Sequence, residues 1–309
     1  MKNIDYPSFK AAVDNLFKNK NIKSEDNVAV ERFMMDFEAH AFTRHAEFGD
    51  GMKMLELLND PASLFDGSNF NKNFTRNLNE FVSAELSSNK TFRSVIKVLT
   101  TNKSKGVGIG ELVLPLLVSG WVRTNGSDGT VLGEQREVKN GEGASLKPIK
   151  KGLVDQGIID TLNKKYFGGM VLGKKNHSKI IEKYGDFSKD VYNNYFSELW
   201  PTANVPDLIE SLKKVGSDVE AFNSVVGRFI LKEYQKIDGW KSIVLVDPKT
   251  LDVVNICDVN DDTCFDKLRF TVRFSREKDT QAVPDGYAVV KLTRLKKSRE
   301  KKVDKTAKV

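Results

Sequence analysis

Residues 106–121 read GVGIGELVLPLLVSGW, and residues 124–147 read TNGSDGTVLGEQREVKNGEGASLK. The first stretch predicts a glycine-rich loop followed by an amphipathic helix that begins near Gly110. The second predicts two extended segments joined by a turn or bend at Gly133. A helix followed directly by paired strands is typical of the centre of a mixed α/β fold.

Charged side chains converge in the second stretch. Side chains alternate along a strand, so Glu137 and Lys139 project to one side while Val138 packs behind them. Asp128 returns to the same place if the two segments form a hairpin. Carboxylate oxygens suit Mg²⁺, and a bound metal acidifies a water that a lysine can position against phosphorus. The pattern predicts a metal-dependent nuclease site, with Glu111 of the preceding helix as a further acid.

An acid-x-lysine triplet is a weak signal when it stands alone. It recurs at Asp247–Lys249, in an expected turn, and at Glu300–Lys302, in a charged tail. Only the triplet at 137–139 follows an upstream aspartate, lies in a strand-like segment and comes after a helix that carries another acid, Glu111. The alternative interpretation is that the upstream aspartate is a turn residue and the triplet is the solvated face of an edge strand.

With these residues the chain resembles the PD-(D/E)xK nuclease superfamily, which has the restriction-endonuclease-like fold. It is also similar, more distantly, to nuclease-like proteins of tailed phages. The resemblance implies Asp128 and Glu137 as metal ligands, Lys139 as the water-orienting base and Glu111 as an auxiliary acid on the first core helix. It implies Mg²⁺ as the ion, with Mn²⁺ as an alternative. Ser127 stands where the family often has proline.

A second interpretation of the glycine-rich run 105–110 is a phosphate-binding loop at the N-terminus of a helix. It lacks the Gly-Lys-Ser/Thr ending of a P-loop and the spacing of a dinucleotide-binding loop. A narrower phosphate-binding interpretation is that Lys103 and Lys105 flank backbone amides that approach a DNA phosphate. The alternative is a plain loop that caps the following helix.

Composition indicates an ordinary globular protein. The chain has 309 residues, 39% of them hydrophobic, and a formal net charge of +7. Eight basic and two acidic residues lie between 294 and 309, including Lys296 and Lys297, so the rest of the chain is almost neutral. Such a tail can bind a phosphate backbone in a salt-dependent way or can simply be solvated. The longest apolar run, 112–118, is too short to span a bilayer, so we expect no membrane association.

The periodicity predicts four regions. We expect a helical N-terminal region at 1–100, with one of its helices near 77–86, and a helical insertion at 150–237. The α/β core is expected at 101–149 plus 238–295, with a hairpin at 241–257, and a basic flexible tail at 296–309. The expected fold class is α/β (α+β), a restriction-endonuclease-like mixed sheet flanked by helices.

A second basic surface is predicted on the alternating strand at 267–274. Lys267, Arg269 and Arg273 share one face of it. If that face borders the catalytic cleft, Arg269 and Arg273 bind DNA phosphates, together with Lys147; if it faces solvent, it is a polar sheet face.

The leading hypothesis is a Mg²⁺-dependent DNA endonuclease or exonuclease that hydrolyses phosphodiester bonds with two carboxylates and a lysine. We expect it in the cytoplasm of a bacterium or of a phage-infected host, or associated with the virion. The alternative is a non-catalytic phage structural or DNA-packaging protein that keeps a nuclease-like fold, as a homo-oligomer or in a particle. The basis of this alternative is the large helical portions at 1–100 and 150–237, together with the basic tail. A third hypothesis is a structure-selective repair or recombination endonuclease.

Overall fold

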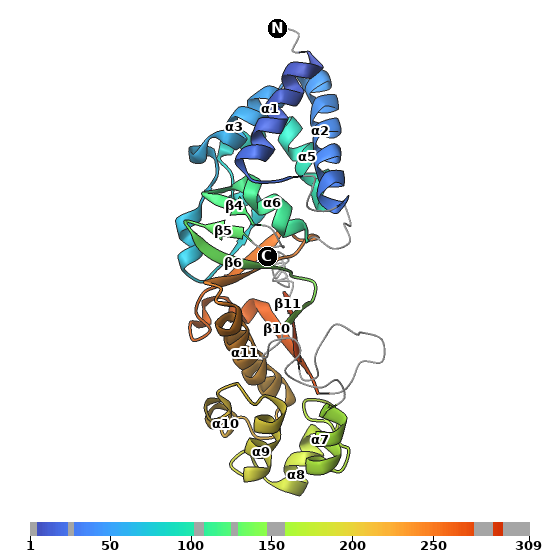
Figure 1. The fold of residues 1–309 in the computed structure, drawn as a ribbon, viewed down its shortest axis with the longest axis vertical. Helices are drawn as coiled ribbons and strands as arrows, with labels where there is room; N and C mark the ends of the chain where they lie inside the picture. The colour runs from blue at the N-terminus through green and yellow to red at the C-terminus, as the bar shows by residue number, and fades with distance from the viewer. Residues whose placement is uncertain are drawn as a thin grey trace, which may run out of the picture.

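The computed structural model describes residues 5–23, 28–101, 108–124, 129–146, 158–274 and 287–292. These residues form a mixed α/β fold in which a six-stranded mixed sheet is flanked by helices, as the sequence predicts. Figure 1 shows N-terminal helices at one end of an elongated molecule, the sheet in the middle and a helical lobe at the other end. Within the described ranges no helix is long and apolar enough to cross a membrane.

The central sheet draws strands from three separated parts of the chain. Its neighbours pair antiparallel, except that β6 and β8 run parallel. In spatial order its strands are β2 (Phe74–Asn77), β9 (Asp252–Ile256), β8 (Ser242–Val246), β6 (Glu134–Asn140), β5 (Gly129–Val131) and β4 (Trp121–Arg123).

Strands β5 and β6 form the hairpin expected around Gly133. Val131 pairs with Glu134, and the two residues between them, Leu132 and Gly133, have φ angles of 54° and 82°. Two-residue hairpin turns favour positive φ at both positions because that twist matches the flanking strands. The expected hairpin of β8 and β9 is confirmed as well.

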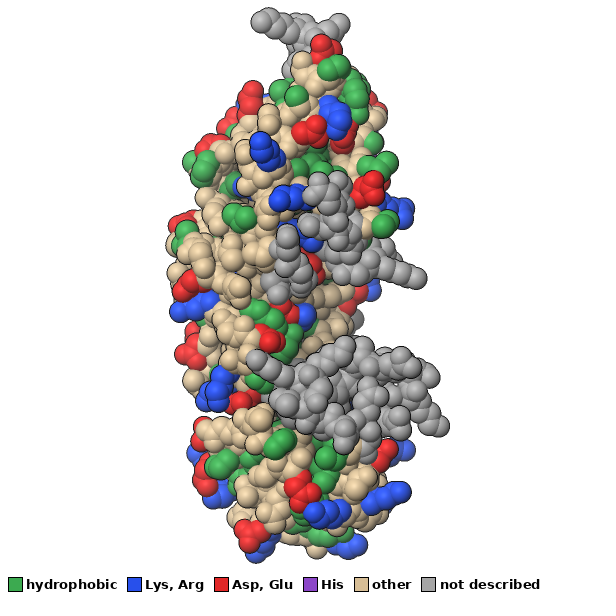
Figure 2. Space-filling model, in the orientation of Figure 1, with side chains coloured by type: hydrophobic (Ala, Val, Ile, Leu, Met, Phe, Trp, Pro, Cys, Tyr) green, Lys and Arg blue, Asp and Glu red, His purple; other side chains and the backbone are tan. Residues whose placement is uncertain are grey.

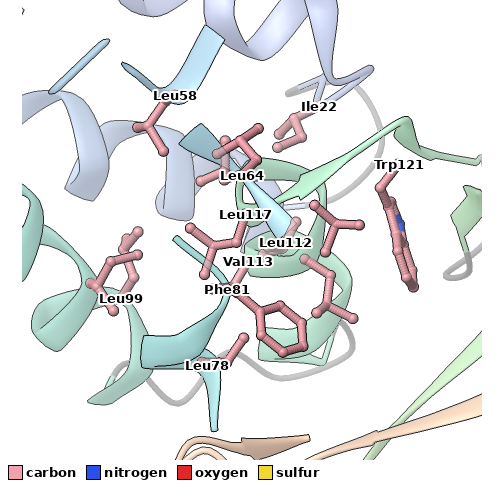
Figure 3. Packing of buried hydrophobic residues seen from close by; sticks show 14 of the residues in the cluster. Ile22, Leu58, Leu64, Leu78, Phe81, Leu99, Leu112, Val113, Leu117 and Trp121 are labelled. Atoms are coloured by element: carbon pink, nitrogen blue, oxygen red, sulfur yellow. The ribbon is translucent and has the colours of Figure 1, made fainter. Parts of the chain in front are cut away.

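Helix α6 (Ile109–Leu117) packs on one face of this sheet and is buried on every side from Gly110 onward. It was expected to be amphipathic, but the N-terminal helices cover the face that the sheet leaves open. Figure 3 shows Leu112, Val113 and Leu117 of α6 among side chains from distant segments. The N-terminal helices are α1 (Tyr6–Asn19), α2 (Val28–Phe48), α3 (Gly51–Asn59), α4 (Ala84–Ser88) and α5 (Lys90–Thr101).

The N-terminal region is mostly helical, but the helix expected near 77–86 is wrong. That stretch holds the end of β2, a 3₁₀ turn and the first residues of α4. Before it, the chain forms β1 (Phe65–Asp66), which pairs with β3 (Val118–Ser119), and then β2, which closes one edge of the central sheet. Asn77 ends β2 by donating to the Thr250 carbonyl oxygen at 2.8 Å. Four phenylalanine rings pack against one another here: Phe65, Phe70, Phe74 and Phe81. These tertiary contacts outweigh the helical spacing of the apolar residues in the sequence. Short 3₁₀ turns link the region: η2 (Pro61–Ser63), η3 (Gly67–Asn71) and η4 (Leu78–Glu80).

The opposite face of the sheet carries a second hydrophobic core that reaches into the helical lobe. Helix α11 (Val219–Asp238) runs from the lobe to the sheet (Figure 1). The lobe matches the predicted helical insertion and contains α7 (Ile158–Phe167), α8 (His177–Tyr184), α9 (Asp190–Leu199) and α10 (Val205–Leu212).

The last strands do not extend the central sheet, although the sequence suggested that they would. After the 3₁₀ turn η5 (Asp262–Lys267), strand β10 (Leu268–Arg273) pairs with β11 (Tyr287–Leu292), which pairs with β7 (Ala144–Leu146). These three form a separate sheet. The edge of β9 that β10 would need is already occupied by β2.

Gly110 allows α6 to lie close to the sheet. A Cβ atom at this position would lie 2.7 Å from Val246 and 2.8 Å from Val138. We expect Gly110→Ala to lower the free energy of unfolding by about 1–3 kcal/mol, because overpacking outweighs the better helix propensity of alanine. Urea unfolding measures this change. Val246→Ala in the same chain should recover part of the loss, and strictly additive effects of the two substitutions would contradict the steric explanation.

Candidate functional site

Glu137 lies in the middle of β6 and is only 2% exposed. Its Oε1 atom accepts a hydrogen bond from the Tyr234 hydroxyl at 2.9 Å and forms an ion pair with the ammonium group of Lys139. A buried carboxylate is costly unless it is paired, and these two contacts pair it. The solvated-face interpretation is therefore wrong for Glu137, since this side chain is buried.

Lys139 reaches from the protein interior toward solvent. Its side chain is 29% exposed. Its Nζ atom lies 5.9 Å from the centroid of the Tyr234 ring, within cation–π range. The ammonium group therefore contacts Glu137 and still has an open side for another ligand.

Glu111 lies in the first turn of α6 and is 8% exposed. Its Oε1 accepts a hydrogen bond from the Gly108 amide at 2.9 Å, which caps the helix. Its Oε2 is buried and has no hydrogen-bond partner. Burial raises the pKa of Glu111 to about 7, although the Gly108 hydrogen bond and the charges of Arg123 and Lys139 act in the opposite direction.

The two acids come from opposite sides of β6. Helix α6 packs on the Val138 side of the strand, and Glu137 and Lys139 project to the α11 side. Both side chains are nevertheless close enough to affect the pKa of Glu111. The structure thus pairs Glu137 with Lys139 on one side of β6 and places Glu111 on the other side.

The fourth predicted residue, Asp128, lies outside the described residues. Strand β5 begins at Gly129, which pairs with Arg136 on β6. From residue 137 onward β6 pairs with β8 on one side, and no strand of the described chain pairs with its other side.

Tyr234 and Arg123 were not identified from the sequence. Tyr234 is 97 positions from Glu137, on a helix that no motif connects with the site. Arg123 is 3% exposed on β4 and its charge lowers the pKa of Glu111. Its backbone amide donates to the Lys20 carbonyl, which ties β4 to the segment after α1. Both contacts depend on tertiary structure, so local sequence carries no signal for them.

The donor set fits a hard cation in part. Glu137 supplies carboxylate oxygens, the ligands that Mg²⁺ prefers, whereas Glu111 lies on the other side of β6 and its Oε2 atom is buried. Among the described residues no group of three or more His, Cys, Asp or Glu side chains could hold a metal. Mg²⁺ usually needs only one or two protein carboxylates, because waters and substrate phosphates complete its shell.

The predicted DNA-binding residues are less well placed. Five of them lie outside the described residues: Lys103, Lys105, Lys147, Lys296 and Lys297. Arg269 and Arg273 lie on β10, in the three-stranded sheet, and so on a different sheet from Glu137. Arg269 is 3.6 Å from Glu220. Lys267 falls in η5 and pairs with Asp266. Figure 2 shows acidic and basic side chains mixed over the face in view.

The loop before α6 supports the capping interpretation. Gly108 is the residue that precedes the helix, and its amide is bonded to Glu111. Residues 102–107 of the glycine-rich run lie outside the described residues.

No family model, no curated protein and no solved structure matches this chain. The assignment of the site rests on its residues and their geometry.

The pKa of Glu111 predicts a pH-dependent stability. The folded pKa of about 7 exceeds the ordinary glutamate pKa of 4.5, so between these two pH values the folded protein holds a proton that the unfolded chain has released. Stability should therefore fall as pH rises from about 4.5 to 7 and then level off, by up to roughly 3 kcal/mol. Glu111→Gln, which keeps the capping oxygen, should remove this part of the pH dependence in urea unfolding. The exposed Glu56→Gln should leave it unchanged; an identical pH profile in all three proteins would contradict the burial of an ionisable Glu111.

Proposed function

We propose that the protein is a Mg²⁺-dependent DNA nuclease that hydrolyses phosphodiester bonds. The observation that carries the proposal is a buried carboxylate, Glu137, ion-paired with a part-exposed lysine on the same strand face. Perturbed, closely spaced ionisable groups cluster at functional sites more often than elsewhere.

Each residue has a distinct role in this proposal. Asp128 and Glu137 hold the ion, and Glu111 is an auxiliary acid on the other side of β6. Because Tyr234 and Lys139 both contact Oε1 of Glu137, its Oε2 atom is the one that is left for the ion. The bound metal supplies a Lewis acid for the phosphate and lowers the pKa of a water.

Lys139 contributes the hydrogen bonds that orient the attacking water or a phosphate oxygen. Its ammonium group has three donors, and its contact with Glu137 leaves others available on the exposed side. The Glu137 carboxylate orients the ammonium group.

Plasmid cleavage with Mg²⁺ or Mn²⁺ tests the proposal. Glu137→Gln, Lys139→Met and Asp128→Asn should each lower the cleavage rate by on the order of 100-fold or more, as expected when a positioned acid, base or ligand is lost. Equal cutting by wild type and all three variants would exclude this site.

A matched control comes from the helical lobe. Lys165 and Glu198 form an ion pair at 2.7 Å between α7 and α9. The double variant Lys165→Met with Glu198→Gln removes the same two charge types and should cut at the wild-type rate. A comparable loss in this control would indicate a general effect of charge on folding or DNA binding.

A non-catalytic role is the second candidate. The capping bond from Gly108 to Glu111 gives this acid a structural role, and the described residues hold no three-ligand cluster. In that case the protein would be a DNA-packaging or structural component. Assembly into a ring or particle on size-exclusion chromatography, without Mn²⁺ binding by calorimetry, would favour it over the nuclease.

A further inference from the structure

Tyr234 is the one described tyrosine that contacts both members of the Glu137–Lys139 pair. Its hydroxyl donates to Glu137 Oε1 at 2.9 Å, and its ring centroid lies 5.9 Å from the Lys139 Nζ atom. The hydroxyl and the ammonium group therefore share one carboxylate oxygen. This arrangement fixes the plane of the Glu137 carboxylate with two donors on the same side.

Several independent contacts hold Tyr234 in place. It lies in the last turns of α11, which ends at Gly239 with φ of 73°, a left-handed cap. The Trp240 ring packs edge-on against the Tyr234 ring at 4.6 Å, and the Gln235 side chain donates to the Ile256 carbonyl of β9 at 2.9 Å. The Lys241 amide donates to the Gln135 carbonyl of β6 at 2.9 Å.

These contacts tie the end of α11 to two strands of the central sheet. The packing of α11 against β6 and β9 therefore holds the Tyr234 hydroxyl in position relative to the sheet. A group that acts on a metal ligand from outside the coordination shell needs such rigidity, because its effect depends on the orientation that it imposes.

We propose that Tyr234 is a positioning residue for Glu137: it holds one carboxylate oxygen and so presents the other to a divalent cation. Tyr234 lies outside the two-carboxylate-plus-lysine site, on the helix that leads into the helical lobe (Figure 1). This positioning role rests on the proposed nuclease function. A purely structural role would be that the hydroxyl only anchors α11 to the sheet.

Calorimetric titration with Mn²⁺ alone, without DNA, separates the two roles. Tyr234→Phe keeps the ring contacts with Trp240 and Lys139 and removes only the hydroxyl. We expect its Mn²⁺ affinity to fall by roughly 10-fold, the usual scale for such outer contacts. In cleavage assays kcat should fall by a similar factor while KM for DNA stays within about twofold, since the hydroxyl contacts a metal ligand and not the DNA.

Tyr192→Phe is the matched control. The buried Tyr192 hydroxyl donates to the Gly185 carbonyl at 2.7 Å, inside the helical lobe. Its loss should lower the melting temperature and leave Mn²⁺ affinity unchanged. A lowered melting temperature with wild-type Mn²⁺ affinity and kcat in Tyr234→Phe would reduce Tyr234 to an anchor and overturn the proposal.

A double-mutant cycle tests whether Tyr234 affects Mn²⁺ affinity through Glu137. If Tyr234 acts through Glu137, adding Tyr234→Phe to Glu137→Gln should cause no further loss of Mn²⁺ affinity. Independent, additive losses would overturn the proposal. If the wild-type protein neither binds Mn²⁺ nor cuts DNA, the nuclease function itself fails and this inference falls with it. An active wild type with an unchanged Tyr234→Phe variant refutes the positioning role alone.

Discussion

The pairing of the buried Glu137 carboxylate is the interaction on which the site depends. A charge inside a sheet must be matched by nearby donors, because removal of one partner leaves the other charge buried and uncompensated. Here one donor, Lys139, comes from the same strand and the other, Tyr234, comes from α11. The sheet and the helix must therefore form together for the carboxylate to be tolerated.

Helix α6 brings a second carboxylate to the other side of the same strand. It can approach only because Gly110 has no side chain where Val138 and Val246 meet it. The close approach buries Glu111, and burial raises its pKa to about 7. The same packing thus stabilises the core and buries an acid whose Oε2 atom has no hydrogen-bond partner.

Much of the fold was predictable from the sequence, and some of it was not. Local signals identified the β5–β6 hairpin at Gly133, the β8–β9 hairpin and the helical lobe, because turn residues and side-chain periodicity act over a few positions. The prediction was wrong for the helix near 77–86 and for the position of β10. A 3₁₀ turn and the start of α4 replace the expected helix, where Phe81 packs among the aromatic side chains around β2, and the pairing of β2 closes the edge of β9.

The sequence alone determined which residues lie on one face of β6: the alternation of a strand puts Glu137 and Lys139 together whatever surrounds them. It also placed Glu111 in the first turn of a helix. Only the tertiary structure decided that Glu137 is buried, that α6 is covered on all sides and that Tyr234 contacts the site from 97 positions away. These properties depend on which elements pack against β6, and contacts between distant segments leave no pattern in the local sequence.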